Sequence, residues 1–539
     1  MAPHTISTNK IPSADAKVAS STSYEIAIIG AGILGSVLAY SLAESGRSVL
    51  LVERDLSEPD RIVGELLQPG GCVALKKLGI DDTLQGIDAV PCEGYKVFWG
   101  QQEVAIPYPQ EDIGMGWSEG GVGADGRKQE GRSFHHGRFI QNLRKKAASS
   151  AGVTLVEATV NDLLRDDLSG GVLGLTATPK SSTTNSDPSP LTYRAHLTII
   201  VDGCMSKFRR QLLPTHVSPL VRSHFVGLVL EDADLPAPHH GHVILGKADP
   251  SSPPSSTPNT IGPVLVYQLA THETRMLIDV RGSKAPSTAQ LAPYLRDNVT
   301  HVLPPSIVPS FHQALDKSTS GDKNYRLRSM PNSFLPPYPQ GRDVQGAFLA
   351  GDSLNMRHPL TGGGMTVAFN DAVLLTGMLG GNKPVGEIKV DSRGPVDLQS
   401  WLDVSERLEE WHWERKAVAS CINVLAMALY SLFGADDENL EVLKTGCFKY
   451  FELGGECIAG PVSLLSALRP SPFYLFYHFF RVAFYSIWIL FTEPVRTAEH
   501  PKGRKPQVWE YPALTVKSVQ VFWTACVVLL PVLWSEGQM

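Results

Sequence analysis

A glycine-rich turn near the start of the chain constrains the fold more than any other feature. The short apolar strand Ile26 to Ile29 leads into Gly30-Ala31-Gly32-Ile33-Leu34-Gly35, a helical stretch runs to Ser45, and a second strand spans Ser48 to Val52. This order forms a βαβ unit, in which N–H groups at the helix start can bind a pyrophosphate. The sequence therefore predicts a dinucleotide-binding lobe, and the alternative is a tight turn without a ligand.

Charged residues directly after the second strand strengthen the prediction of a bound dinucleotide. Glu53 stands at the end of that strand, about 20 residues after the turn, where a carboxylate accepts hydrogen bonds from ribose hydroxyls. Arg54 and Arg61 follow, and either one alone is most often a solvated surface charge. Together with Glu53 they indicate the adenosine and phosphate end of an FAD site.

A later glycine segment indicates the flavin end of the same site. Asp352 follows the apolar strand Ala347 to Ala350 and can accept a hydrogen bond from a ribityl hydroxyl. The run Gly362 to Met365, which includes Gly363 and Gly364, offers successive backbone N–H groups at a helix start, suited to the pyrimidine oxygens of a flavin. His358 invites a catalytic interpretation, but a structural histidine beside Pro359 is favoured.

Composition excludes several classes of protein. The chain has 539 residues and a net charge of -6, without the basic stripe that binds nucleic acid. Its seven cysteines show no C-x-x-C spacing, so we expect neither a zinc site nor a disulfide framework, and we expect a reducing, cytosol-facing location. Met1 to Ser23 lacks the apolar core of a signal peptide and is predicted to be a disordered arm.

The order of strand and helix signals predicts a mixed α/β (α+β) fold, in which an FAD-binding Rossmann lobe is interleaved with a β-sheet substrate lobe. Ser- and Pro-rich inserts at Lys180 to Pro190 and Asp249 to Pro258, and the run Gly120 to Gly126, are expected to be loops. The expected divisions are an arm (1–23), the first part of the FAD lobe (24–213, of which 91–135 joins the substrate lobe), the substrate sheet (214–340), the second part of the FAD lobe (341–400) and a helical region (401–539).

The last third of the chain is helical and apolar. Trp401 to Phe433 is predicted to be one long amphipathic helix. Phe473 to Phe491 and Leu514 to Trp534 are each near the 20 or so residues that span a bilayer. Buried core helices are the alternative, but aromatic residues at the segment ends favour a membrane anchor that spans the bilayer or lies in its interface.

Several longer stretches resemble the squalene epoxidase family of FAD-dependent monooxygenases, which has the aromatic-hydroxylase fold. The resemblance covers the chain from Tyr24 onward except the two polar inserts, and it is carried by the stretches Val52 to Asp55, Arg61 to Gly71, Phe134 to Phe139, Val201 to Arg209, Ser329 to Pro331, Asn355 to Val367, Leu453 to Cys457 and Ala459 to Pro461. The chain lacks the longer hydrophobic N-terminal segment of some animal members, and its compact N-terminus and inserts are more similar to fungal members.

The resemblance implies epoxidation of squalene to (S)-2,3-oxidosqualene by FAD and O2 in sterol (ergosterol) biosynthesis. We find no second glycine fingerprint with an acidic partner, so we expect electrons to come from NADPH through a membrane-bound cytochrome reductase. The implied location is the cytosolic face of the endoplasmic reticulum, with contact to membrane lipid through the C-terminal helices. Two alternatives stay open: a related FAD monooxygenase acting on another apolar terpenoid or an aromatic compound, and a non-catalytic relative of the same fold.

The resemblance also implies roles for individual residues. Tyr108 matches the active-site tyrosine of the family and Gln68 the glutamine that holds it, a pair that would border both flavin and substrate. A loop aromatic packed between prolines is the alternative for Tyr108. Phe448 and Phe451 would line a channel for an apolar chain, or form the core face of a helix. The implied FAD contacts are Glu53, Arg54, Arg61, Arg138, Asp352 and Met365, with a backbone contact from Val160 to the adenine.

Overall fold

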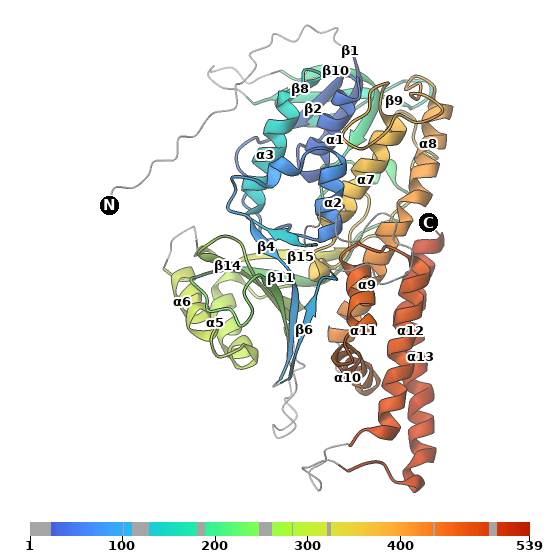
Figure 1. The fold of residues 1–539 in the computed structure, drawn as a ribbon. Helices are drawn as coiled ribbons and strands as arrows, with labels where there is room; N and C mark the ends of the chain where they lie inside the picture. Colours follow the sequence, from blue (N-terminus) through green and yellow to red (C-terminus); the bar gives the residue numbers. More distant parts are fainter. Residues whose placement is uncertain are drawn as a thin grey trace.

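The computed structural model describes residues 23–100, 102–109, 129–180, 189–246, 261–282, 284–320, 325–434, 437–494 and 504–538. It contains two lobes, one above the other in Figure 1, and a helical region along one side that extends beyond them. The predicted arm apart from Ser23, the run Gly120 to Gly126 and most of the two polar inserts lie outside the described residues.

A parallel sheet forms the centre of the first lobe. Its strands pair in the order β8, β2, β1, β10, β16, and every neighbouring pair is parallel. These strands are β1 (Ser23–Ile29), β2 (Val49–Glu53), β8 (Val153–Arg165), β10 (Leu191–Ile200) and β16 (Ala347–Leu349). A further strand, β9 (Val172–Pro179), pairs antiparallel with the end of β8 and the start of β10. The strands are apolar on both faces, as a sheet covered by helices requires.

Helices bury this sheet and the turns that follow it. They are α1 (Ile33–Glu44), α2 (Pro69–Lys77), α3 (His136–Ser149), α4 (Arg209–Leu212), α7 (Gly364–Leu379) and α8 (Trp401–Glu414). Side chains from α1, α3, α7 and α8 join the strands in one large hydrophobic core. The register Ile29 to Ile200 and Ile200 to Leu349 brings the carboxyl ends of β1, β10 and β16 to the same edge. Ligands of open α/β sheets bind at this edge.

The second lobe is a seven-stranded sheet in the order β15, β11, β14, β13, β12, β5, β6, antiparallel except between β12 and β5. The strands are β5 (Gly94–Trp99), β6 (Gln102–Pro107), β11 (Leu220–Glu231), β12 (His240–Leu245), β13 (Ile261–Gln268), β14 (Glu273–Arg281) and β15 (Arg328–Phe334). One face packs on α5 (Thr288–Val299) and α6 (Val308–Ser318), and the other faces the C-terminal helices. A small sheet of β3 (Leu66–Leu67), β7 (Gly131–Ser133) and β4 (Val90–Cys92) lies between the lobes.

The C-terminal region contains α9 (Lys416–Gly434), α10 (Glu438–Glu452), α11 (Glu456–Leu465), α12 (Pro472–Thr492) and α13 (Tyr511–Gln538). The prediction of one helix over Trp401 to Phe433 is wrong, because the chain breaks into α8 and α9 at Arg415. The Arg415 guanidinium donates to both carboxylate oxygens of Asp371 on α7, at 2.8 and 2.7 Å, and both side chains are buried. This ion pair anchors the junction of the two helices on α7.

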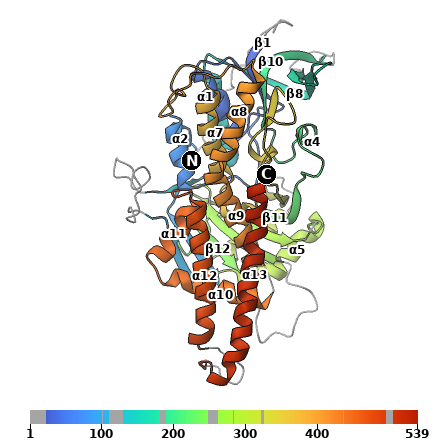
Figure 2. The same ribbon diagram turned by 90° about the vertical axis from the view of Figure 1, so that its right-hand side faces the viewer.

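Within the described ranges, three helices are long and apolar enough to cross a membrane: α9, α12 and α13. Half of the most apolar window of α9 is buried inside the protein, but the corresponding fractions for α12 and α13 are 28% and 17%. These two helices form a hairpin that projects past the second lobe, on the side away from the first (Figures 1 and 2). The apolar C-terminal helices are therefore compatible with membrane attachment.

Candidate active site

Close packing of backbone fixes the glycine turn at the carboxyl edge of the parallel sheet. Gly30 has φ of 106°, in the left-handed region that favours glycine. A Cβ on Gly35 would lie 1.9 Å from the carbonyl oxygen of Gly30, so only glycine allows α1 to begin this close to β1. By contrast, a Cβ on Gly32 would meet no atom within 4 Å. Gly30 and Gly35 are thus tightly packed against neighbouring backbone, whereas the space beside Gly32 is free of protein atoms.

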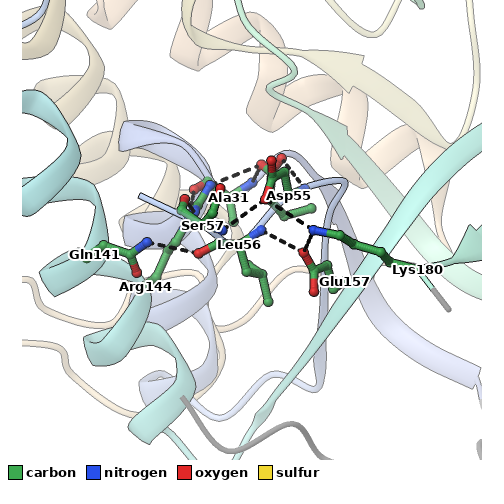
Figure 3. Close-up of polar contacts among 9 residues, drawn as sticks. Ala31, Asp55, Leu56, Ser57, Gln141, Arg144, Glu157 and Lys180 are labelled. Atoms are coloured by element: carbon green, nitrogen blue, oxygen red, sulfur yellow. Dashed lines mark hydrogen bonds and ion pairs between the residues drawn. The ribbon is translucent and has the colours of Figure 1, made fainter. Parts of the chain in front are cut away.

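Glu53 lies beside the glycine turn and is held there by its neighbours. Its Oε2 accepts a hydrogen bond from the backbone N–H of Ala31 at 2.8 Å. Arg144 of α3, which is 3% exposed, donates to the carbonyls of Ala31 at 2.8 Å and Ser57 at 3.0 Å, and its Nη2 lies 3.6 Å from Glu53 Oε2. Figure 3 shows Arg144 between these two segments. The adjacent loop is further fixed by Lys180, which contacts both Asp55 and Glu157.

Arg209 links the other two segments at this edge. Its guanidinium donates to the carbonyls of Cys204 and Asp352, each at 2.9 Å, and to that of Ser353 at 2.8 Å. The loop around Asp202 and the short helix η4 (Gly351–Ser353) are therefore joined. Leu34 of α1 packs against Gly351, at 3.2 Å from the position of a Cβ on that glycine. All three sequence motifs consequently meet at one place.

The groups at this edge fit FAD. Neither α1 nor α7 has a side chain capping its N-terminus, so N–H groups at both helix starts remain for a ligand. The Asp352 side chain is exposed, and so are those of Arg54 and Arg61. Carboxylates suit ribose and ribityl hydroxyls, guanidinium groups suit phosphates, and a Cβ on Gly364 would meet no atom within 4 Å. Bound FAD would thus be held by these carboxylates, arginines and helix starts.

The remaining predicted FAD contacts lie in several elements. Arg138, in the first turn of α3, is partly exposed. Val160 lies in β8, and its carbonyl accepts from Lys207 Nζ at 3.3 Å. Gly363 packs on Ile422 of α9, and Met365 is buried in the first turn of α7. Their roles stay predictions.

Gln68 connects two buried tyrosines to the glycine run. Its Oε1 accepts from the Tyr108 hydroxyl at 2.7 Å, and its Nε2 donates to the carbonyl of Thr361 at 2.7 Å and to the hydroxyl oxygen of Tyr95. Gln68 is fully buried, and the rings of Tyr95 and Tyr108 meet edge to face at 5.9 Å. Burial raises the pKa of both tyrosines, which therefore stay protonated.

A large apolar cavity begins at Tyr95 and Thr361. It encloses about 1250 Å³ of space free of protein atoms, including its open part. Its wall comes from β5, β6 and β12 on one side and from α9 to α13 on the other, and includes Leu429, Phe433, Phe451, Leu475 and Val528. Phe451 thus lines the cavity, whereas Phe448 packs on Trp99 at 5.9 Å between ring centroids. The residue before the glycine run, Thr361, therefore borders a space suited to a hydrocarbon.

His358 is held in the structure by contacts on every side. Its Nδ1 accepts from the backbone N–H of Leu360 at 3.2 Å, and its Nε2 faces Ser223 Oγ at 3.2 Å and Asp279 Oδ1 at 3.5 Å. Its ring stacks on Tyr430 at 3.9 Å, and it is 2% exposed. The structure therefore gives His358 the structural role that the sequence favoured.

Sequence reasoning missed Tyr95 and Arg144 and gave Arg209 no separate role, and the geometry brings all three to the site. Tyr95 contacts Gln68 and lines the cavity, but in the sequence it is one apolar residue of a strand. Arg144 and Arg209 look like surface charges on helices, yet both are buried and hold site backbone. Arg209 closes the stretch Val201 to Arg209, whose D-G-x-x-S-x-x-R form is found in flavin monooxygenases, but no comparable signal marks Tyr95 or Arg144.

Curated relatives match nearly the whole chain. The chain is 41% identical to the squalene epoxidase erg1 of Aspergillus fumigatus, over 98% of this chain and 97% of that protein. It is 43% identical to the squalene epoxidase ERG1 of Gibberella zeae, over 95% of both. The squalene monooxygenase of Mus musculus is 39% identical, over 96% of this chain and 78% of the mouse protein.

Family models and solved structures agree with these relatives. Residues 194–500 match the squalene epoxidase model, and residues 25–59 match that of the FAD dependent oxidoreductases. The flavin-dependent brominase Bmp2 has a TM-score of 0.58 at 14% identity, covering 86% of this chain and 99% of the brominase. The anhydrotetracycline hydroxylase OxyS of Streptomyces rimosus has 0.57 at 17%, covering 83% and 76%. These structures share the fold, and the relatives at 39 to 43% identity over almost the full length show that the chain belongs to the squalene epoxidase family of FAD-dependent monooxygenases.

Proposed function

We propose that this protein epoxidises squalene to (S)-2,3-oxidosqualene, with O2 as the second substrate, in sterol biosynthesis. Apart from family membership, one observation of the structure supports this proposal. The apolar cavity borders Leu360 and Thr361, and the next residues are the glycine run proposed to bind the flavin. A hydrocarbon in this cavity would reach the flavin without passing through water.

The lining of the cavity supports an apolar substrate. Leucine, valine, alanine and phenylalanine dominate the wall. Such a wall binds a hydrocarbon by burying apolar area, at roughly 25 cal/mol per Å². A polar aromatic substrate would find few hydrogen-bonding partners there.

The residues of this chain position the reactants and exclude water. When bound, FAD supplies the activation of O2 and the transfer of one oxygen atom to the alkene. We propose that Glu53, Arg54, Arg61, Arg138, Val160, Asp352 and Met365 contact FAD. The hydrogen bonds of Gln68 fix Tyr95 and Tyr108 beside the glycine run, and the apolar wall keeps bulk water out. Neither tyrosine gives up its proton at neutral pH, so their part is to donate hydrogen bonds and to shape the site.

We propose that the α12–α13 hairpin attaches the enzyme to the endoplasmic reticulum membrane and that a membrane-bound reductase delivers electrons from NADPH. Aromatic residues are exposed along the hairpin: Phe473 (88%), Trp488 (64%), Trp509 (75%) and Trp523 (69%). Exposed tryptophans of this kind favour the membrane–water interface. Because Leu475, Phe479 and Val528 of the same hairpin line the cavity, squalene dissolved in the membrane would enter directly from lipid.

The proposal is tested by incubating the detergent-solubilised enzyme with FAD, NADPH, a cytochrome reductase and squalene. We expect 2,3-oxidosqualene as the product, and we expect the matched variant Asp352→Asn to form it more slowly because the amide binds the ribityl hydroxyl less well. An enzyme that leaves squalene untouched but oxygenates a polar aromatic compound would instead support the alternative monooxygenase. A protein that binds no FAD would support the non-catalytic alternative.

A further inference from the structure

The last turn of α13 contains a buried carboxylate. Most of α13 is apolar and exposed, and Trp534 in its final turns is 66% exposed. Glu536, two residues later, is only 3% exposed. Figures 1 and 2 show that this end of α13 returns to the body of the protein beside α9, whereas the other end of the hairpin projects away.

Three polar side chains on one face of α9 bind this residue. Ser420 Oγ donates to Glu536 Oε2 and Asn423 Nδ2 donates to Glu536 Oε1, each at 2.8 Å. Lys416 Nζ donates to the backbone carbonyl of Glu536 at 2.6 Å. A carboxylate in the last turn of a helix is unfavourable for that helix, whose C-terminal end carries partial negative charge. Contacts with α9 must therefore hold it, and they come from the N-terminal, positive half of α9.

The hydrogen bonds continue from Asn423 into the loop after η4. Asn423 Nδ2 also donates to Asn355 Oδ1 at 3.2 Å, and both asparagines are fully buried. Asn355 Nδ2 donates to the carbonyl of Leu335 at 2.9 Å. Asn355 lies three residues after Asp352 and seven before Gly362, so it sits in the segment proposed to bind the flavin.

A buried cation lies at the far end of this chain of contacts. Arg357 Nη2 donates to Asn355 Oδ1 at 2.8 Å and to the Asn355 carbonyl at 2.9 Å. Among the described residues, Arg357 Nε and Nη1 have no hydrogen-bond partner, and the residue is 8% exposed. Burial lowers the pKa of Arg357, and Asp352, Asp371 and Glu536 oppose that shift. Asp371 already pairs with Arg415, so Glu536 is the carboxylate that hydrogen bonds connect to Arg357 through the two asparagines.

We propose that Glu536 is a positioning residue for FAD: through Asn423 and Asn355 it fixes the segment Gly351–Met365, and it thereby ties the end of the membrane hairpin to the cofactor site. The proposal rests on the proposed function, because it needs FAD to bind at that segment. Coupling of this kind is reciprocal. FAD binding therefore also stabilises the last turn of α13.

The first test compares the FAD dissociation constants of three variants in detergent, where membrane binding plays no part. Glu536→Ala removes both hydrogen bonds and the charge, and we expect the FAD Kd to rise about tenfold or more, as for loss of hydrogen bonds to a buried charged group. Glu536→Gln keeps both contacts but removes the charge, and we expect a smaller rise. Trp534→Ala, on the exposed side of the same helix end, is the control and should leave the Kd unchanged.

A further variant separates loss of FAD positioning from misfolding. Asn423→Leu has the branched shape of asparagine and the same number of side-chain heavy atoms, and it leaves Glu536 bound to Ser420 and Lys416, but it breaks the link to Asn355. We expect a raised FAD Kd with unchanged helix content. Hydrogen exchange gives a readout that a merely structural role would not move: FAD should slow exchange in residues 533–538 of the wild-type protein but not of Asn423→Leu.

The outcomes separate the two proposals. A wild-type protein that binds no FAD refutes the proposed function. A wild-type protein that binds FAD, together with folded Glu536→Ala and Asn423→Leu variants of unchanged FAD Kd, refutes the positioning role alone. Equal slowing of exchange by FAD in wild type and Asn423→Leu also refutes it.

Discussion

Replacing Tyr95 by phenylalanine tests the role of the tyrosine pair most sharply. The variant removes the oxygen to which Gln68 Nε2 donates, and Gln68 keeps its bonds to Thr361 and Tyr108. A buried polar group that loses one partner costs about 1–3 kcal/mol. Because Tyr95 also lines the cavity, losing this bond lets Gln68 and the wall beside the alkene shift, and we expect the misplacement to lower kcat/KM by roughly tenfold.

Tyr108→Phe is the matched control, because it also removes one hydrogen bond from Gln68, yet Tyr108 is not among the described residues that line the cavity. Both variants should lose similar stability and keep their FAD. The assay follows the initial rate of epoxide formation at several squalene concentrations. We expect Tyr108→Phe to lower kcat/KM less than Tyr95→Phe does. Equal losses, or a larger loss in Tyr108→Phe, would refute the reasoning.

Three further predictions concern the cofactor turn, acid stability and the hairpin. Gly35→Ala should abolish flavin absorbance, because its Cβ would lie 1.9 Å from the carbonyl oxygen of Gly30. Gly32→Ala is the control and should fold normally, because its Cβ would meet no atom within 4 Å. A purified Gly35→Ala protein that is yellow would contradict this prediction. Burial lowers the pKa of His136 to about 4 in the folded protein, whereas in the unfolded chain the pKa is about 6.5. Between these pH values the unfolded chain therefore binds a proton that the folded protein does not, and the free energy of unfolding falls by up to about 3 kcal/mol as the pH is lowered. His136→Asn, which keeps the donor to the Gly64 carbonyl, should lose less stability between pH 7 and pH 4.5 in denaturant titrations, and an unchanged loss would count against this assignment. Trp488→Ser with Trp523→Ser should weaken binding to phospholipid vesicles without changing the FAD Kd; unaltered vesicle binding would move the membrane contact elsewhere.

Local sequence signals were enough to predict much of the first lobe. The glycine spacing at Gly30 to Gly35 reflects backbone contacts within a few residues, and it predicted the βαβ unit that the structure contains. The apolar strand before Asp352 and the presence of a sheet within residues 214–340 were also predictable, because strand signals depend on the pattern of neighbouring residues. The break at Arg415 was not, because no glycine or proline marks it, and the partner of Arg415, Asp371, lies 44 residues away.

Contacts between distant segments explain what the sequence could not predict about the site. Gln68 meets Tyr95 and Thr361 only after the two lobes have packed, across separations of 27 and 293 residues. Arg144 belongs to no sequence motif, and its role depends on the hydrogen bonds it donates to the carbonyls of Ala31 and Ser57. Glu536 looks like a charged residue at a chain end, and only folding shows that it is buried against α9.

Isotope labelling tests the central claim, FAD-dependent epoxidation of squalene, most directly. The purified enzyme, loaded with FAD, would be supplied with NADPH, a cytochrome reductase and squalene under ¹⁸O₂ in ordinary water. We predict 2,3-oxidosqualene that contains one ¹⁸O atom, with one NADPH consumed per epoxide. Epoxide oxygen derived from water, or NADPH consumption that yields hydrogen peroxide and no epoxide, would contradict the account.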